Sequence, residues 1–230
     1  NEEHIMPRVI SWPANVNPVS FDLISGPQAY GNEGQGSLTG LFQTVSSPYG
    51  LVAYTIALKP LQGAQEREYR GTLTALHGGA NVVKMTFPDG ARREAPYQSW
   101  AGGVEWASGQ QWGQQLAIVS VGANAYEGDT QITLSDEYWG HDLGIGEVIG
   151  FSDYWGAHTI TEIISAGTYR IWPALRNDIT TAQKASLRPS IAVTVVAQSS
   201  SYSRQLANTG NLSVTLREVR DDYVREHFLA

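Results

Sequence analysis

The distribution of apolar side chains along the chain is the feature that most constrains its fold. Only residues 64–77 are predicted to be helical, because Tyr69, Leu73 and Leu76 recur there on one helical face. On both sides of this segment, short stretches alternate apolar with small or polar residues and end at Gly, Pro or Asn, as strands joined by turns do. The two glycines after His77 can adopt left-handed backbone and end the helix. The sequence therefore predicts an all-β protein with one helix.

The expected strands fall into two groups. The first group lies on either side of the helix, at residues 16–24, 51–58 and 81–87. The second group begins after a Trp-containing segment, and its short, evenly spaced strands suggest a small closed or half-closed barrel: residues 115–121, 130–134, 148–151, 158–164 and 167–172. A further strand is expected at residues 190–197, and a last one at residues 211–217.

The last strand determines the predicted domain organisation. It needs a sheet to join, and because the barrel already holds several strands, we expect it to return to the first group. Residues 1–94 with 198–230 are therefore predicted to form a β-sandwich, and residues 95–197 an inserted β-barrel. The predicted connecting segments are a long ordered loop at 91–114, a mobile Ser/Asn/Gly-rich loop at 198–211 and a charged tail at 218–225.

Composition excludes several classes of function. The 230 residues are 42% apolar, enough for a real core, and the absence of cysteine excludes disulfides, thiolate zinc sites and cysteine nucleophiles. The formal charge of −7 would repel a phosphate backbone, so we expect no specific nucleic-acid binding. Without an apolar run long enough for a membrane helix and without the features of a signal peptide, the chain is expected to be soluble, with no membrane partner.

The low content of charged residues allows two interpretations. Charged residues make up 16% of the chain, well below the ~25% of an ordinary globular protein. Such a surface is typical of proteins that are partly covered by other subunits. It is also compatible with a Gly-rich β-protein that has no such partner.

Two short motifs carry a resemblance to a known family. Residues 37–43 read SLTGLFQ and are followed by a strand, a proline-bounded turn and the helix that ends at His77-Gly-Gly; residues 169–176 read YRIWPALR. These motifs and the order of the elements between them resemble the distal tail proteins (Dit-like) of long-tailed bacteriophages over most of residues 12–197. The chain departs from the family pattern at residues 51–54, LVAY, where a tryptophan is often found.

The resemblance implies a structural protein of the virion rather than an enzyme. Such a protein is a baseplate or tail-tip ring subunit, made in the host cytoplasm, whose β-sandwich ring domain carries an inserted OB-like barrel. The partners it implies are further copies of the chain in a homo-hexameric ring, the tail tube protein, and a baseplate hub or tail fibre protein. In this family the motif at residues 169–176 has a structural role.

No residue pattern predicts a catalytic, cofactor-binding or metal-ligating site. The five histidines lack the spacing of metal sites, and His77 is placed to interact favourably with the C-terminal dipole of the helix. Ser152-Asp153 and His141-Asp142 lack the nucleophile elbow of a hydrolase. Two carboxylates could support glycan hydrolysis, but too many candidates exist, and most lie beside glycines in turns: Glu105, Glu127, Asp129, Asp136, Glu137, Asp142, Glu147, Asp153 and Glu162.

Aromatic residues support an alternative function, a carbohydrate-binding module that recognises a host surface glycan through the inserted barrel. Aromatic rings stack on sugars, and OB-like barrels commonly bind oligosaccharides. The same residues suit a subunit interface or a core. The candidates are Trp100, Trp106, Trp112, Tyr138, Trp139, Tyr154, Trp155 and Trp172.

The motif at residues 169–176 also has an interpretation based on its residues alone. Trp172 and Leu175 can plug the base of the barrel, and Arg176 is expected to pair with an acidic turn.

Overall fold

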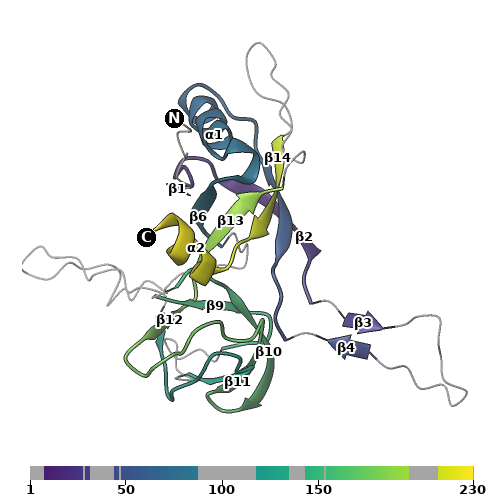
Figure 1. Cartoon of the computed structure of the whole chain (residues 1–230), viewed down its shortest axis with the longest axis vertical. Coiled ribbons are helices and arrows are strands. Elements are labelled where there is room, and N and C mark those ends of the chain that lie inside the picture. Colours follow the sequence, from purple (N-terminus) through teal and green to yellow (C-terminus); the bar gives the residue numbers. More distant parts are fainter. Residues whose placement is uncertain are drawn as a thin grey trace, which may run out of the picture.

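The computed structural model of the chain describes residues 8–27, 29–31, 44–46, 48–87, 118–134, 143–152, 154–196 and 212–229. These residues form two six-stranded sheets, a two-stranded hairpin and two short helices, so the protein is mostly β-structure (Figure 1). The two sheets lie one above the other in Figure 1. The hairpin, β3 (Ala29–Gly31) with β4 (Thr44–Ser46), lies to one side of both.

The first sheet has the strand order β1-β6-β13-β14-β5-β2. The pair β1–β6 is parallel and the other pairs are antiparallel. Its strands are β1 (Val9–Ser11), β2 (Pro18–Ser25), β5 (Ala53–Leu58), β6 (Val82–Thr86), β13 (Ser190–Val195) and β14 (Leu212–Glu218).

The second sheet has the order β7-β12-β9-β10-β11-β8. It is not a closed barrel, although an isolated bridge between Val121 and Leu134 and a 2.8 Å hydrogen bond from the Gly122 N–H to the Thr133 carbonyl join its two edges. Its strands are β7 (Ile118–Ser120), β8 (Gln131–Thr133), β9 (Val148–Phe151), β10 (His158–Ser165), β11 (Thr168–Trp172) and β12 (Lys184–Ser186).

The path of the chain between the sheets confirms one expectation and corrects another. β14 pairs with β5 and β13, so the last predicted strand does return to the first sheet. β13 lies between β6 and β14 in that sheet, whereas the predicted insertion of residues 95–197 assigned residues 190–197 to the barrel. The physical reason is burial, since Ile191, Ala192 and Val193 in succession are buried. A strand buried on both faces needs a central position in a sheet.

Helix α1 (Ala64–Ala75) confirms the predicted helix, which ends two residues earlier than expected. Tyr69 and Leu76 are buried in the core of the first sheet, and Leu73 packs against the same core. A short 3-10 turn, η1 (His77–Gly79), follows, with Gly78 and Gly79 at φ values of +67° and +108°. Left-handed backbone follows the helix as the sequence suggested, but it begins at His77, at a φ of +46°, one residue before the glycines.

The apolar face of α1 yields a stability prediction. Replacing Leu73 with Ala should lower the free energy of unfolding by about 1–2 kcal/mol, less than for a fully buried leucine because Leu73 is only partly buried. Arg67→Ala, at an exposed position of the same helix, is the matched control and should change it by less than about 0.5 kcal/mol. Urea unfolding of the two variants measures the difference. Equal midpoints would contradict the packing of α1.

Helix α2 (Asp221–Phe228) was not predicted, because residues 218–225 were interpreted as a charged tail. The helix has Asp221 and Asp222 in its first turn and Arg225 and His227 in its last, the arrangement that the helix dipole favours. It packs through Val224 against Val82 and Ala192, two buried residues of the first sheet. The charges therefore stabilise a docked helix.

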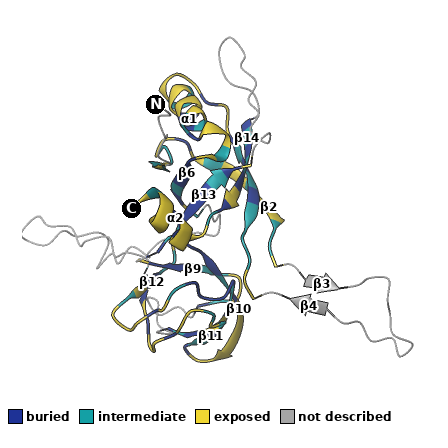
Figure 2. Cartoon of the chain, viewed as in Figure 1, coloured by how far each residue is buried: buried dark blue, intermediate teal, exposed yellow. Residues whose placement is uncertain are grey.

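The two sheets have separate apolar cores, and both sheets contain buried segments, drawn dark blue in Figure 2. The core of the second sheet comes entirely from residues 119–187 among the described residues. The core of the first sheet gathers residues from β5, β6, β13, β14 and α1, and also includes Ala157 and the partly buried Val148 of the second sheet. The second sheet is therefore self-contained, but shares an apolar contact with the first.

Several predictions concern residues outside the described ranges. They are the motif at 37–43, the loops at 91–114 and 198–211, and residues 115–117 of one strand. No helix in the described part of the chain has the length and apolar character that a membrane span requires.

Candidate functional site

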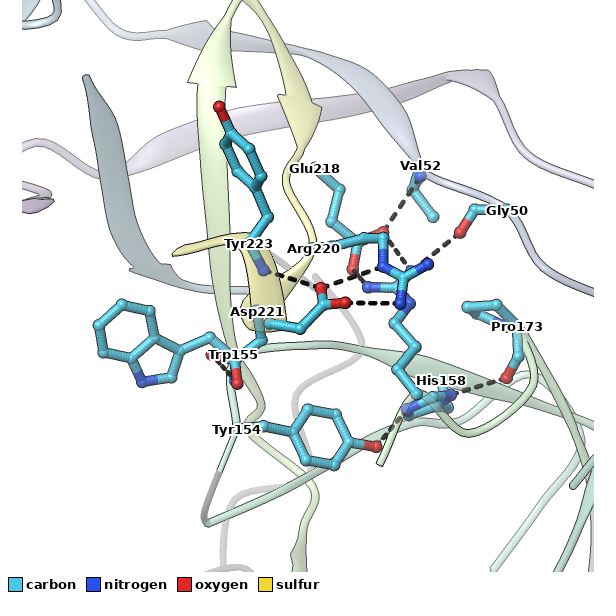
Figure 3. Close-up of polar contacts among 12 residues, drawn as sticks. Gly50, Val52, Tyr154, Trp155, His158, Pro173, Glu218, Arg220, Asp221 and Tyr223 are labelled. Carbon is cyan, nitrogen blue, oxygen red and sulfur yellow. Dashed lines mark hydrogen bonds and ion pairs between the residues drawn. The ribbon is translucent and has the colours of Figure 1, made fainter. Parts of the chain in front are cut away.

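The site with the most buried polar groups is the junction where loops of the second sheet meet β14 and α2 of the first (Figure 3). Polar residues are rare in the interior of this protein: the buried ones among the described residues are Thr72, Asn81, His158, Arg176, Glu218 and Asp221. Three of these six, Arg176, Glu218 and Asp221, take part in hydrogen bonds that cross between the two sheets. His158 lies beside them.

Arg176 and Glu218 form a bidentate ion pair across the junction. Arg176 follows β11, and its two terminal nitrogens lie 2.8 and 3.1 Å from the two carboxylate oxygens of Glu218, the last residue of β14. Arg176 also donates to the Gly50 carbonyl at 2.9 Å, and Glu218 accepts the Val52 N–H at 3.2 Å. Both side chains are at most 5% exposed. The parallel geometry and the further bonds to backbone are what a buried pair needs to offset its desolvation.

This arrangement settles the expectations for the motif at residues 169–176. Arg176 does pair with a carboxylate, but the partner lies at the end of a strand and not in a turn. Leu175 lies in the core of the second sheet, as expected. Trp172 does not belong to that core; its ring lies so close to Gly50 that a Cβ there would be 2.5 Å from Cζ2. Trp172 therefore contacts the loop before β5.

His158, at the start of β10, is fully buried beside this pair. Its Nδ1 lies 2.7 Å from the Pro173 carbonyl and its Nε2 lies 2.5 Å from the Tyr154 hydroxyl. A carbonyl can only accept, so Nδ1 carries the proton and Nε2 accepts from Tyr154. Burial, opposed by the bond to Pro173 and reinforced by Arg176, lowers the pKa of His158 from 6.5 to about 4. Burial likewise raises the pKa of Tyr154 well above its usual range.

Asp221 adds a second polar link across the junction. This buried carboxylate accepts the backbone N–H of Trp155 at 3.0 Å and the Nε of Arg225 at 2.5 Å. The Trp155 ring in turn has the Lys84 ammonium 4.7 Å and the Arg225 guanidinium 5.9 Å from its centroid. Trp155 lies in the loop between β9 and β10 of the second sheet, whereas Lys84 lies in β6 and Asp221 and Arg225 lie in α2. These contacts therefore join the second sheet to the first sheet and its docked helix.

A cleft of about 780 Å³ lies elsewhere between the two sheets. It is lined by the loop after β1, by β6, by the turn before β9 and by the turn before β13. Trp12, Lys84, Glu147 and Arg188 contribute the aromatic and charged side chains. Trp12 is itself fixed, because its indole N–H donates to the Val16 carbonyl at 2.6 Å.

The candidate metal-binding and catalytic residues that the structure describes do not gather into one site. Among the described residues no three His, Asp or Glu side chains gather in a way that could hold a metal ion. Asp129 accepts the Tyr126 N–H at 2.8 Å and Glu147 the Gly144 N–H at 3.0 Å, as carboxylates in turns are expected to do. Glu162 pairs with Arg170 at 2.6 Å. The candidates outside the described residues are His4, Glu105, Asp136, Glu137, His141, Asp142 and Asp153.

Of the aromatic candidates for glycan contact, some lie within the described residues and the others lie outside them. Tyr154 is buried and bonded to His158, and Trp172 faces Gly50 with its indole nitrogen buried. Trp155 is half-buried, and two cations, Lys84 and Arg225, lie near its ring. The remaining candidates lie outside the described residues: Trp100, Trp106, Trp112, Tyr138 and Trp139.

Glu218 and Asp221 were not among the candidates from the sequence. A signal for Glu218 was present, because Leu212, Val214, Leu216 and Glu218 alternate along β14 and all four are buried. A carboxylate that continues the inward-facing positions of a strand predicts a buried partner. Comparison with protein-family models and with curated proteins gives no match for this chain.

Proposed function

We propose that this chain is a structural virion protein of a phage tail tip, a distal-tail-like subunit whose ring joins the tail tube to the baseplate hub or receptor-binding apparatus. The observation that carries the proposal is the path of the chain. The strands of the first sheet come before and after those of the second sheet in the sequence, because the chain leaves the first sheet after β6 and re-enters the first sheet at β13. This plan agrees with the resemblance, in which a β-sandwich ring domain carries an inserted OB-like barrel.

On this proposal the first sheet with α1 forms the ring domain, and residues 118–186 form the OB-like insert that points away from the ring. The exposed apolar residues of β2 support an assembling role. This edge strand pairs only with β5 among the described strands, and Val19, Leu23 and Ile24 on it are 66%, 60% and 57% exposed. Apolar groups gathered on an open edge are typical of surfaces that contact another chain.

The buried junction suits such a subunit. A subunit that connects other proteins must keep its two parts in a fixed relative orientation. A bidentate ion pair fixes the orientation of the two parts as well as the distance between them. Glycan binding through the second sheet would have to use aromatic residues other than Tyr154 and Trp172, since both are occupied by internal contacts.

The proposal is tested by the mass of the purified protein in solution, alone and with the tail tube protein. A closed homo-oligomer, hexameric by the resemblance, is expected in at least one of these conditions. Electron microscopy of the virion with labelled antibody should place the protein at the tail tip. A chain that remains monomeric in both conditions and is missing from the virion would contradict the proposal, as would steady release of sugar from cell-wall glycans.

A further inference from the structure

We propose that the junction between the two sheets is an acid-released joint, in which protonation of His158 frees the second sheet to move relative to the first. The inference does not depend on the assembly proposed above. It rests on His158, which is fully buried, has both ring nitrogens in hydrogen bonds, and lies close enough to Arg176 for the two charges to interact.

The hydrogen bonds of His158 are compatible only with the neutral ring. Nε2 accepts from the Tyr154 hydroxyl, so a proton on Nε2 would oppose the proton of that hydroxyl. The hydroxyl would then have to rotate and accept, and no buried acceptor for its own proton is found among the described contacts of Tyr154. Nδ1 already donates to Pro173. The protonated ring can therefore keep one of its two bonds unchanged, but not both.

The new charge would also act on Arg176. The charged groups that act on the His158–Tyr154 pair come from three places: Arg176 from the segment after β11, Glu218 from β14 and Asp221 from α2. Both carboxylates are already engaged, Glu218 by Arg176 and Asp221 by Arg225 and Trp155. A second cation beside Arg176 would weaken its bonds to Glu218 and to the Gly50 carbonyl, which cross the junction.

The direction of the pH dependence follows from linkage. If opening exposes His158 to water, its pKa rises from about 4 toward the ordinary 6.5. Protons therefore favour the open joint below pH 6.5, by about tenfold for each pH unit at first, by about 160-fold at pH 4, and by a limiting factor of about 300 at lower pH. Above pH 6.5 both states are neutral at His158, and pH has no effect through this residue. Histidine protonation is a common trigger for changes at interfaces in this range.

The joint can be tested with a fluorescent pair that spans the junction. The chain contains no cysteine, so Glu68→Cys on α1 and Ser165→Cys at the end of β10, both exposed, provide two unique labelling sites. Single-molecule energy transfer should show one distance population from pH 8 to 6.5. A second, longer-distance population should grow as the pH falls from 6.5 to 4, while far-UV circular dichroism stays native.

Three variants of this labelled protein decide the outcome. His158→Gln should remove the growth of the longer population, and Tyr154→Phe, which deprives Nε2 of its donor, should move the transition to higher pH. His227→Gln, at an exposed histidine of α2, should behave like the parent. A single population in the parent down to pH 4, or an unchanged transition in His158→Gln, would overturn the proposal. If His158→Gln does not fold, an unchanged transition in Tyr154→Phe overturns it.

Discussion

Replacing Glu218 with Gln is expected to lower the free energy of unfolding by about 3–5 kcal/mol, because it leaves the Arg176 guanidinium buried without an opposite charge. Arg176 is 6% exposed and cannot reach water without disrupting the junction. For a chain of this size the loss corresponds to a fall in melting temperature of about 10 °C. Differential scanning calorimetry at pH 7 measures it, provided that unfolding is reversible.

The matched control is Glu162→Gln. Glu162 also pairs with an arginine, Arg170, at 2.6 Å, but the two side chains are 54% and 45% exposed. Water solvates both charges there, so the control should cost at most about 1 kcal/mol. If the two glutamine variants melt at the same temperature, the Arg176–Glu218 pair is not buried as described.

A double variant separates the charge from the packing. Arg176→Met added to Glu218→Gln removes the uncompensated cation, and the Gln side chain can still accept the Val52 N–H. The Gly50 carbonyl loses its donor, at a cost of about 1–3 kcal/mol. The double variant should therefore be more stable than Glu218→Gln alone and less stable than the parent. A double variant less stable than Glu218→Gln would show that Arg176 acts chiefly through packing.

Local periodicity predicted most of the regular structure in the described residues. Alternation found every long strand, and the helical repeat found α1, because these patterns come from the one-sided burial that the sheets and the helix undergo. The strands β1, β3, β4 and β12, of three residues each, were not predicted individually, whereas β7 and β8 are as short but lie within longer alternating stretches. α2 was missed since it has only one buried apolar residue, Val224, and its charges resemble those of a solvated tail.

Relations between distant segments could not be predicted in the same way. The assignment of β13 to the first sheet depends on its pairing with β6, more than 100 residues earlier, and the partner of Arg176 lies 42 residues later. In such cases the sequence can indicate that a charged residue is buried and needs a partner of opposite charge. It does not identify which residue is that partner. The junction therefore depends on contacts between segments far apart in the sequence, which local patterns do not encode.

Replacing Gly150 with Ala is expected to be the second most damaging change. Gly150 lies in β9 where it pairs with β12, and a Cβ there would lie 2.5 Å from the Gly156 carbonyl oxygen and 2.5 Å from Cβ of Pro189. Carbon atoms do not approach so closely, and neither neighbour is the end of a flexible side chain. Pro189 leads into β13, and its carbonyl accepts the Phe87 N–H at 2.8 Å, so its movement would disturb the first sheet as well.

The expected cost is about 3 kcal/mol, the upper end for overpacking, because the strain falls on backbone in both sheets. Gly144→Ala is the control, since a Cβ at that position meets no atom within 4 Å. Neither glycine has a positive φ, so the two substitutions have similar effects on the unfolded chain and no left-handed residue is lost. The difference between their urea midpoints therefore measures the destabilisation caused by the close contacts of the added Cβ at position 150. A Gly150→Ala protein as stable as Gly144→Ala would mean that β9 does not press against the Pro189 turn, and the contact that brings the second sheet onto the first would need another explanation.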